Sequence, residues 1–277
     1  MLDRLAEKLL NVRAETRSAI DAVRAVLPLL RSRRGADEVR EKAPNDLVTA
    51  TDVLVQSTLQ QILAERHPDI AFVGEESGLD LPSSAPRQWL VDPICGTSNY
   101  AAGLPLFATN VALVEDGHIS LSAALDGGTG DIYVAEAGGG AWQVISEGPR
   151  RLSVSPANRL VSIDPDTRRE PGVRAFPTEF ALEALRRRRW EVRALSSTLA
   201  LVYLANGRLG AAVYATEGAA LHVAAGVLLA REAGALVTDH DGAEWSLDSP
   251  ICVAAASQEL HAEVLTLAAE VYTRLTL

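Results

Sequence analysis

Acidic side chains follow apolar stretches at three places in the first hundred residues. Asp52 closes the stretch Val-Thr-Ala-Thr, Glu75 and Glu76 follow Ile-Ala-Phe-Val-Gly, and Asp92 follows Trp-Leu-Val, where a buried strand is expected to end. Oxygen ligands at such positions suit a hard cation such as Mg²⁺, which takes few carboxylates and leaves room for water and a substrate phosphate. The pattern predicts a divalent-cation site, with solvated strand caps as the alternative interpretation.

A Gly/Thr turn lies close to the last of these carboxylates. Gly96, Thr97 and Ser98 follow Asp92 after three intervening residues. If the segment opens a helix, its free backbone N–H groups and the helix dipole attract a phosphate. Metal and anion sites would then lie side by side, as phosphoryl transfer to water requires. Cys95 stands in the middle of this site, and the purpose of a thiol there has to be explained.

Hydrophobic periodicity predicts the elements that position these residues. Residues 3–33 have helical spacing, and a second helix follows Thr51 and ends near His67. Short apolar runs between residues 107 and 144, separated by glycine-containing turns, predict an antiparallel meander. In the second half, predicted helices (178–189, 197–206, 222–232 and a C-terminal one) alternate with predicted strands (209–214, 235–238, 251–256). A composition rich in Arg, Pro and Asp near 150–170 predicts a domain boundary between an N-terminal half, 1–152, and a C-terminal half, 153–277.

Composition argues against several classes of protein. A net charge of −10 is unfavourable for a general nucleic-acid binder, because phosphate backbones require a basic face. No apolar stretch reaches the roughly 20 residues that span a bilayer, and the opening MLDRLAEKLL lacks the apolar core of a signal peptide. Two cysteines, Cys95 and Cys252, without paired spacing fit free thiols in a reducing compartment. We therefore expect a cytoplasmic protein without nucleic-acid or membrane partners.

Four segments resemble, in order and spacing, the signature segments of the inositol monophosphatase family. They are DLVTATD (46–52), GEES (74–77), WLVDPICGTSNY (89–100) and HVAAGVLLAREAGALVTD (222–239), and four ordered motifs are far more specific than one. The resemblance implies a layered αβαβα fold, usually homodimeric, with an N-terminal α+β half and a C-terminal α/β half. It also implies a magnesium-dependent, lithium-sensitive phosphatase whose partner is a small phosphorylated metabolite, a sugar or polyol phosphate.

The resemblance also implies roles for individual positions. Glu75, Asp92 and the Ile94 carbonyl would hold the first metal, Mg²⁺. The catalytic positions, which hold or orient the attacking water, would be Asp52, Glu76 and Thr97. Phosphate would bind at Gly96, Thr97 and Ser98, and substrate contacts would come from Arg193, Ser196 and Glu217. Glu217 is displaced from the usual spacing, so a solvated loop glutamate is its alternative interpretation.

Two positions depart from the family pattern. Cys95 and His222 stand where the family has aspartates that, together with the position of Asp92, form a second metal site. One interpretation is weakened catalysis, leaving an inactive family member that binds a phosphorylated ligand or serves as a dimeric scaffold. Another is a changed metal, because an O/S/N ligand set suits Zn²⁺, with Mn²⁺ as a further candidate. A cysteine nucleophile is disfavoured, since residues 96–103 contain no arginine to hold a phosphoryl group. The paired replacement favours retained phosphatase activity with an altered second metal.

Overall fold

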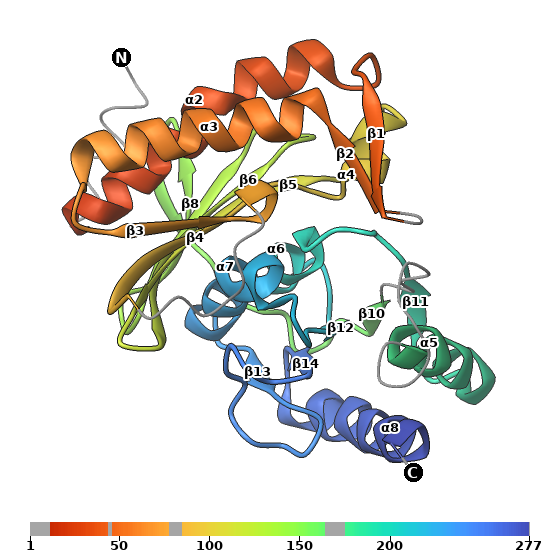
Figure 1. Ribbon diagram of the computed structural model, residues 1–277. Helices are drawn as coiled ribbons and strands as arrows, with labels where there is room; N and C mark the ends of the chain where they lie inside the picture. The colour runs from red at the N-terminus through yellow and green to blue at the C-terminus, as the bar shows by residue number, and fades with distance from the viewer. Residues whose placement is uncertain (1–11, 44–45, 78–84, 164–174, 277) are drawn as a thin grey trace.

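The elements stack in five layers, helices alternating with sheets (Figure 1). The computed structural model describes residues 12–43, 46–77, 85–163 and 175–276. Within these ranges the order is a helical layer, a seven-stranded sheet, a second helical layer, a five-stranded sheet and a third helical layer. This confirms the predicted αβαβα fold. No helix in the described ranges is both long and apolar enough to cross a membrane.

The first layer consists of two long helices on one face of the seven-stranded sheet. Helix α2 is Ala14–Arg33 and α3 is Ala50–Arg66, so helical spacing predicted both, although residues 3–11 lie outside the described residues. Their fully buried apolar side chains join the core of the sheet, and each such side chain contributes about 1.5–3 kcal/mol of burial. Thr49 begins α3 through a reciprocal capping box with Asp52. The capping box therefore places a buried carboxylate at the start of the helix.

The seven-stranded sheet carries the first acidic motifs. Its strands, in spatial order, are β3 (Ala71–Gly74), β4 (Arg87–Cys95), β5 (Ala108–Glu115), β6 (His118–Asp126), β7 (Ile132–Glu136), β8 (Gly140–Ile145) and β9 (Gly148–Arg151). Strands β5 to β8 form the predicted antiparallel meander, and β9, which was not predicted, extends it. Strands β3 and β4 are parallel, with Gly74 opposite Val91. Their carboxyl ends therefore bring Glu75 and Asp92 to the same edge.

Strand β4 is longer than the sequence predicted. An end at Asp92 is wrong, because the strand continues to Cys95, which pairs with Ala108, after an irregular step in register that begins at Asp92. Pro93 lies inside that step, and a residue without an N–H is tolerated where the ladder is interrupted. The thiol is consequently held by the sheet and not by a loop.

A small hairpin was missed by hydrophobic patterning. Strands β1 (Val39–Ala43) and β2 (Asp46–Thr49) pair antiparallel in a separate two-stranded sheet. The sequence predicted only a turn over residues 43–46, because the segment Val-Arg-Glu-Lys-Ala lacks the apolar alternation of a half-buried strand. The hairpin lies near α4 (Thr97–Ala101) (Figure 1).

The C-terminal half forms the remaining layers. Its sheet has the order β11 (Glu191–Arg193), β10 (Leu160–Ile163), β12 (Ala211–Ala215), β14 (Ile251–Ala255) and β13 (Leu236–Thr238). Helices α6 (Leu199–Ala205) and α7 (Ala220–Glu232) lie between the sheets, whereas α5 (Phe176–Arg187) and α8 (Gln258–Thr276) cover the outer face (Figure 1). Helix α7 is apolar on nearly every side because both sheets pack against it. The short strands β10 and β11 were not predicted.

Candidate active site

Asp92 is a fully buried carboxylate whose two oxygens have different surroundings. Oδ2 lies 2.7 Å from His222 Nδ1, whereas Oδ1 is buried and has no hydrogen-bond partner among the described residues. Burying an unpartnered carboxylate oxygen is strongly unfavourable unless something else neutralises it. Asp92 therefore fits a cation ligand better than a structural cap.

Glu75 reinforces the same requirement. Burial raises the pKa of Glu75, and the negative charge of Asp92 raises it further, against the opposing influence of His222 and Lys42. Glu75 Oε2 lies 4.0 Å from His222 Nδ1, so the carboxylates of β3 and β4 converge on one region. The Ile94 carbonyl lies two residues beyond Asp92 on β4. Glu75, Asp92 and Ile94 thus supply oxygen donors of the kind a hard divalent cation takes.

Lys42 also belongs to this region, although no sequence motif predicted it. The β1–β2 hairpin brings Lys42 Nζ to 3.1 Å from Glu75 Oε1 and 2.7 Å from Glu76 Oε1. Burial opposes the charge of the ammonium group, but the two glutamates raise the pKa of Lys42 above its usual value. Gln56 of α3 accepts the backbone N–H of Glu76 at 2.8 Å. The Gln56–Glu76 and Lys42–Glu76 contacts join residues that are 20 and 34 positions apart in the sequence.

The buried Asp52 contacts Thr97, which is half-buried. Asp52 Oδ2 accepts the backbone N–H and the hydroxyl of Thr49 at 2.8 and 2.6 Å. Its other oxygen lies 3.2 Å from Thr97 Oγ1, which is also 3.0 Å from the Ile94 carbonyl oxygen. Burial, aided by the charges of Glu75 and Glu76, raises the pKa of Asp52 to about 6 despite the Thr49 hydrogen bonds. A carboxylate with that pKa can accept a proton near neutral pH.

The two unusual residues, Cys95 and His222, lie together with Asp92. One ligand atom from each of the three falls within 4.8 Å of the others. Cys95 Sγ accepts the backbone N–H of Thr198 at 3.2 Å, and burial, followed by the charge of Asp92, raises the pKa of the thiol well above its usual value. A protonated thiol is a poor nucleophile, and it must release its proton before its sulfur can bind a thiophilic ion as a thiolate. The donor set fits Zn²⁺ with one open position.

The Gly/Thr turn begins α4, as the sequence predicted. Gly96 has φ +102°, and a Cβ there would lie 2.9 Å from both the Leu106 and Ser196 carbonyl oxygens. Only glycine fits that left-handed, crowded position without strain. Thr97 and Ser98 form the first turn of α4. The N–H groups of this turn lie beside the carboxylate cluster through the Thr97–Asp52 contact.

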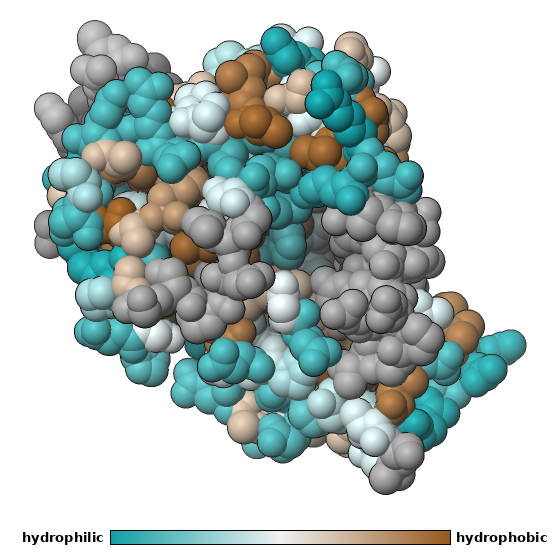
Figure 2. Space-filling view, in the orientation of Figure 1, coloured by the Kyte–Doolittle hydropathy of each residue, from teal (hydrophilic) through white to brown (hydrophobic). Residues whose placement is uncertain are grey.

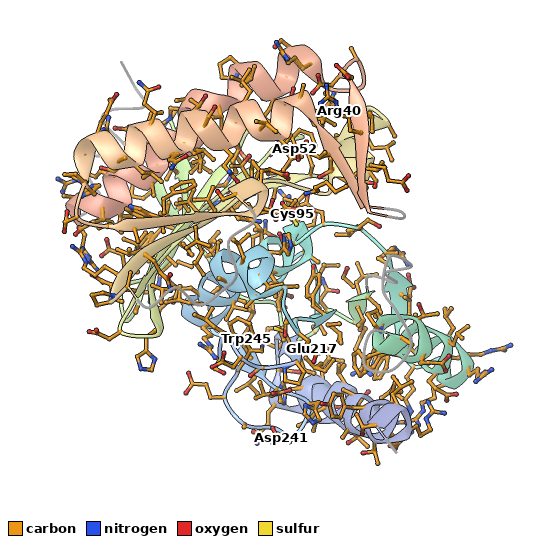
Figure 3. The ribbon with its side chains drawn as sticks, in the orientation of Figure 1. Arg40, Asp52, Cys95, Glu217, Asp241 and Trp245 are labelled. Atoms are coloured by element: carbon orange, nitrogen blue, oxygen red, sulfur yellow. The ribbon has the colours of Figure 1, made fainter. Side chains whose placement is uncertain are left out.

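Figures 2 and 3 show the site in its surroundings. Asp52 lies in the first turn of α3, and Cys95 lies below it, toward the α6–α7 layer (Figure 3). The space-filling view has a hydrophilic hollow at that place, below α3 (Figure 2).

The three predicted substrate contacts are not gathered in one place. Ser196 has φ +51°, and its carbonyl accepts Asn99 Nδ2 at 3.4 Å, close to α4. Arg193 is exposed and pairs with Glu191 of its own strand at 3.0 Å. Glu217 is exposed, its backbone N–H donates to Pro250, and Figure 3 places it well away from Cys95, on the side of the C-terminal sheet. Substrate roles for these residues stay predictions.

Converging carboxylates beside a glycine-led helix start, held in an αβαβα stack, fit a metal-dependent phosphatase. The family comparison agrees, because the model of the inositol monophosphatase family matches residues 11–273. The chain therefore belongs to the inositol monophosphatase family. It is accordingly a phosphoric monoester hydrolase. Members of this family generally use Mg²⁺.

Individual relatives support this assignment. The chain is 33% identical to an inositol-1-monophosphatase of Mesorhizobium japonicum over 78% of this chain and 81% of the relative. It is 32% identical to a histidinol-phosphatase of Mycobacterium tuberculosis, over 86% and 91% of the two chains. Among solved structures, the Thermotoga maritima IMPase matches with a TM-score of 0.81 and 27% identity, covering 92% of this chain and 97% of that one.

Proposed function

We propose that the chain hydrolyses the phosphomonoester of a small sugar or polyol phosphate, with water as the nucleophile. Glu75, Asp92 and the Ile94 carbonyl would hold Mg²⁺ as the first metal. The observation that carries this proposal is the buried Oδ1 of Asp92, which has no hydrogen-bond partner among the described residues and lies at the same edge of the sheet as Glu75. Without a cation, no described residue satisfies that buried oxygen.

The chain's own groups would perform the proton transfer and the phosphate binding. A bound divalent ion supplies Lewis-acid stabilisation of the phosphate and acidifies the attacking water. The Thr97 hydroxyl, 3.2 Å from Asp52 Oδ1, would orient that water and pass its proton to Asp52. Glu76, held in place by its ion pair with Lys42, would also hold water. The N–H groups of Gly96, Thr97 and Ser98 would receive the phosphate oxygens.

At the second site we infer a thiophilic ion. Asp92, Cys95 and His222 provide one oxygen, one sulfur and one nitrogen within 4.8 Å of one another. Thiolate and imidazole ligands suit Zn²⁺ better than Mn²⁺, and they suit either of these ions better than Mg²⁺. An ion there would stabilise the leaving alkoxide. In the family pattern, two aspartates at the positions of Cys95 and His222 help to hold that ion.

The competing function is a weak or inactive family member that binds a phosphorylated ligand or serves as a dimeric scaffold. One observation favours it: His222 Nδ1 is already engaged by Asp92 at 2.7 Å, so the pair satisfies itself without an ion. Relatives at nearly equal identity carry the names inositol-1-monophosphatase and histidinol-phosphatase. Sequence similarity therefore does not identify the substrate. Arg193, Ser196 and Glu217 remain our candidates for substrate contact.

Steady-state assays separate the two functions. Inositol-1-phosphate, fructose-1,6-bisphosphate and 3′-phosphoadenosine phosphate would each be tested with Mg²⁺, Mn²⁺ and Zn²⁺, alongside metal analysis of the purified protein. We expect turnover that Glu75→Gln and Asp92→Asn abolish and that Glu244→Gln, an exposed carboxylate paired with Arg231, leaves unchanged. Absence of turnover with every metal would reject the enzymatic function in favour of the binding one.

Assembly and compartment complete the proposal. We propose a homodimer, as is usual in the family, located in the cytoplasm. Both cysteines are free and buried, which suits a reducing compartment. Size-exclusion chromatography with light scattering would test the dimer.

A further inference from the structure

Asn110 contacts the surroundings of both unusual ligands. It lies in β5 opposite Asp92 and is only 1% exposed. Its Nδ2 donates to Thr198 Oγ1 at 2.8 Å and to the His222 carbonyl oxygen at 3.4 Å. A carbonyl only accepts, so the amide nitrogen must face His222. One buried side chain thereby joins the segment before α6 to the first turn of α7.

These two segments control Cys95 and His222. Thr198 donates its backbone N–H to Cys95 Sγ at 3.2 Å, and His222 presents Nδ1 to Asp92 at 2.7 Å. Directly opposite residues on paired strands also share one face of the sheet, so Asn110 and Asp92 lie on the same side. Asn110 therefore contacts Thr198, whose backbone binds Cys95, and the backbone of His222, and it lies opposite Asp92 in the sheet.

Packing alone does not explain an asparagine at this position. Asn110 Oδ1 is buried without a hydrogen-bond partner among the described residues, and a half-satisfied buried amide is unfavourable compared with an apolar side chain. Polar residues that violate packing rules in this way concentrate at functional sites.

We propose that Asn110 is a positioning residue for the Asp92/Cys95/His222 centre and sets the spacing of thiol and imidazole for a soft divalent ion. The proposal rests on the thiophilic second site proposed above. Residues that orient metal ligands without touching the metal typically change metal affinity when they are removed.

The test measures metal binding, not turnover. Zn²⁺ affinity would be determined by competition with a chromophoric chelator, and the Co²⁺-substituted protein would be examined for its thiolate-to-cobalt charge-transfer band. Asn110→Ala and Thr198→Val should each weaken Zn²⁺ binding by about 10- to 100-fold and shift the band. The double variant should bind no more weakly than the weaker single variant, because both remove the same link.

Two controls accompany these variants. Thr198→Ser keeps the hydroxyl acceptor and should bind Zn²⁺ like the unaltered protein. Ser122→Ala removes another buried, unpartnered polar group of the same sheet, on β6, and should also leave affinity and spectrum unchanged. Thermal unfolding in chelator would establish that every variant is folded. If Asn110→Ala fails to fold, the nearly isosteric Thr198→Val carries the test.

The outcomes separate this inference from the proposal beneath it. Unchanged Zn²⁺ affinity and an unchanged cobalt band in both Asn110→Ala and Thr198→Val would overturn the positioning role. If Cys95→Ala nevertheless abolished the band, the thiophilic site would stand without Asn110. If Cys95→Ala also left binding unchanged, the thiophilic site itself would be wrong.

Discussion

Restoring the family's aspartates should make the stability of this protein depend on Mg²⁺. The double variant Cys95→Asp/His222→Asp places two new carboxylates beside Asp92, where the ligand atoms now lie within 4.8 Å of one another. At that distance and an effective dielectric constant of about 20, each ionised pair repels by about 3.5 kcal/mol. The substitution also removes the 2.7 Å contact between His222 and Asp92. Protonation relieves part of the repulsion, so we expect a loss of about 3 kcal/mol in the free energy of unfolding without metal.

Unfolding in chelator and in Mg²⁺ measures this effect. The double variant should melt about 10 °C below the unaltered protein in chelator. Mg²⁺ at a hundred times its dissociation constant should restore about 2.7 kcal/mol. The unaltered protein should respond less to Mg²⁺ and more to Zn²⁺, because two of its three ligands there are soft.

A charge-matched control excludes a general electrostatic effect. Leu182→Asp/Leu185→Asp adds the same two negative charges at exposed positions of α5. This control should lose little stability in chelator and should gain no more from Mg²⁺ than the unaltered protein does. If the Cys95/His222 variant unfolds in chelator like the unaltered protein and Mg²⁺ adds nothing, the three positions do not form one metal site.

Three further predictions test the rest of the site and the fold. Asp52→Asn should lower kcat by about 10²- to 10⁴-fold while Mg²⁺ affinity by calorimetry is retained; unchanged kcat would remove Asp52 from proton transfer. Hydrogen bonds from Arg13 hold the pKa of Glu115 at about 2, below its usual 4.5. Its ion pairs therefore stabilise above pH 4.5 and lose this contribution as pH falls toward 2. Glu115→Gln should thus be about 1–2 kcal/mol less stable at pH 7, after allowance for solvent screening, with a difference that shrinks on acidification in urea titrations; a pH-independent difference would contradict this cause. Gly96→Ala should cost about 1–3 kcal/mol of stability by denaturant unfolding, since a Cβ would press on two carbonyl oxygens at 2.9 Å, and full stability would show that the turn relaxes.

Local patterns were enough to predict most elements. Periods of helix and strand predicted α2, α3 and the meander β5–β8, because amphipathic spacing is written into neighbouring residues. An Ala/Leu-rich run closed by Gly234 predicted α7. Hydrophobic periodicity did not predict the β1–β2 hairpin or strands β10 and β11, because these strands are too short or too polar to show a period. It also ended β4 at Asp92, since a proline normally signals the end of a strand and here lies inside a register irregularity.

For the site, the sequence alone determined the chemical inventory. It identified the carboxylates, the Gly/Thr turn, and the replacement of two aspartates by Cys95 and His222, because residue types and their order are local facts. Only the tertiary structure decided which groups meet. The contacts of Lys42 with Glu75, of Thr198 with Cys95, and of Asn110 with the His222 backbone join segments 33, 103 and 112 residues apart. Such contacts arise from the packing of sheets and helices, which no local pattern encodes.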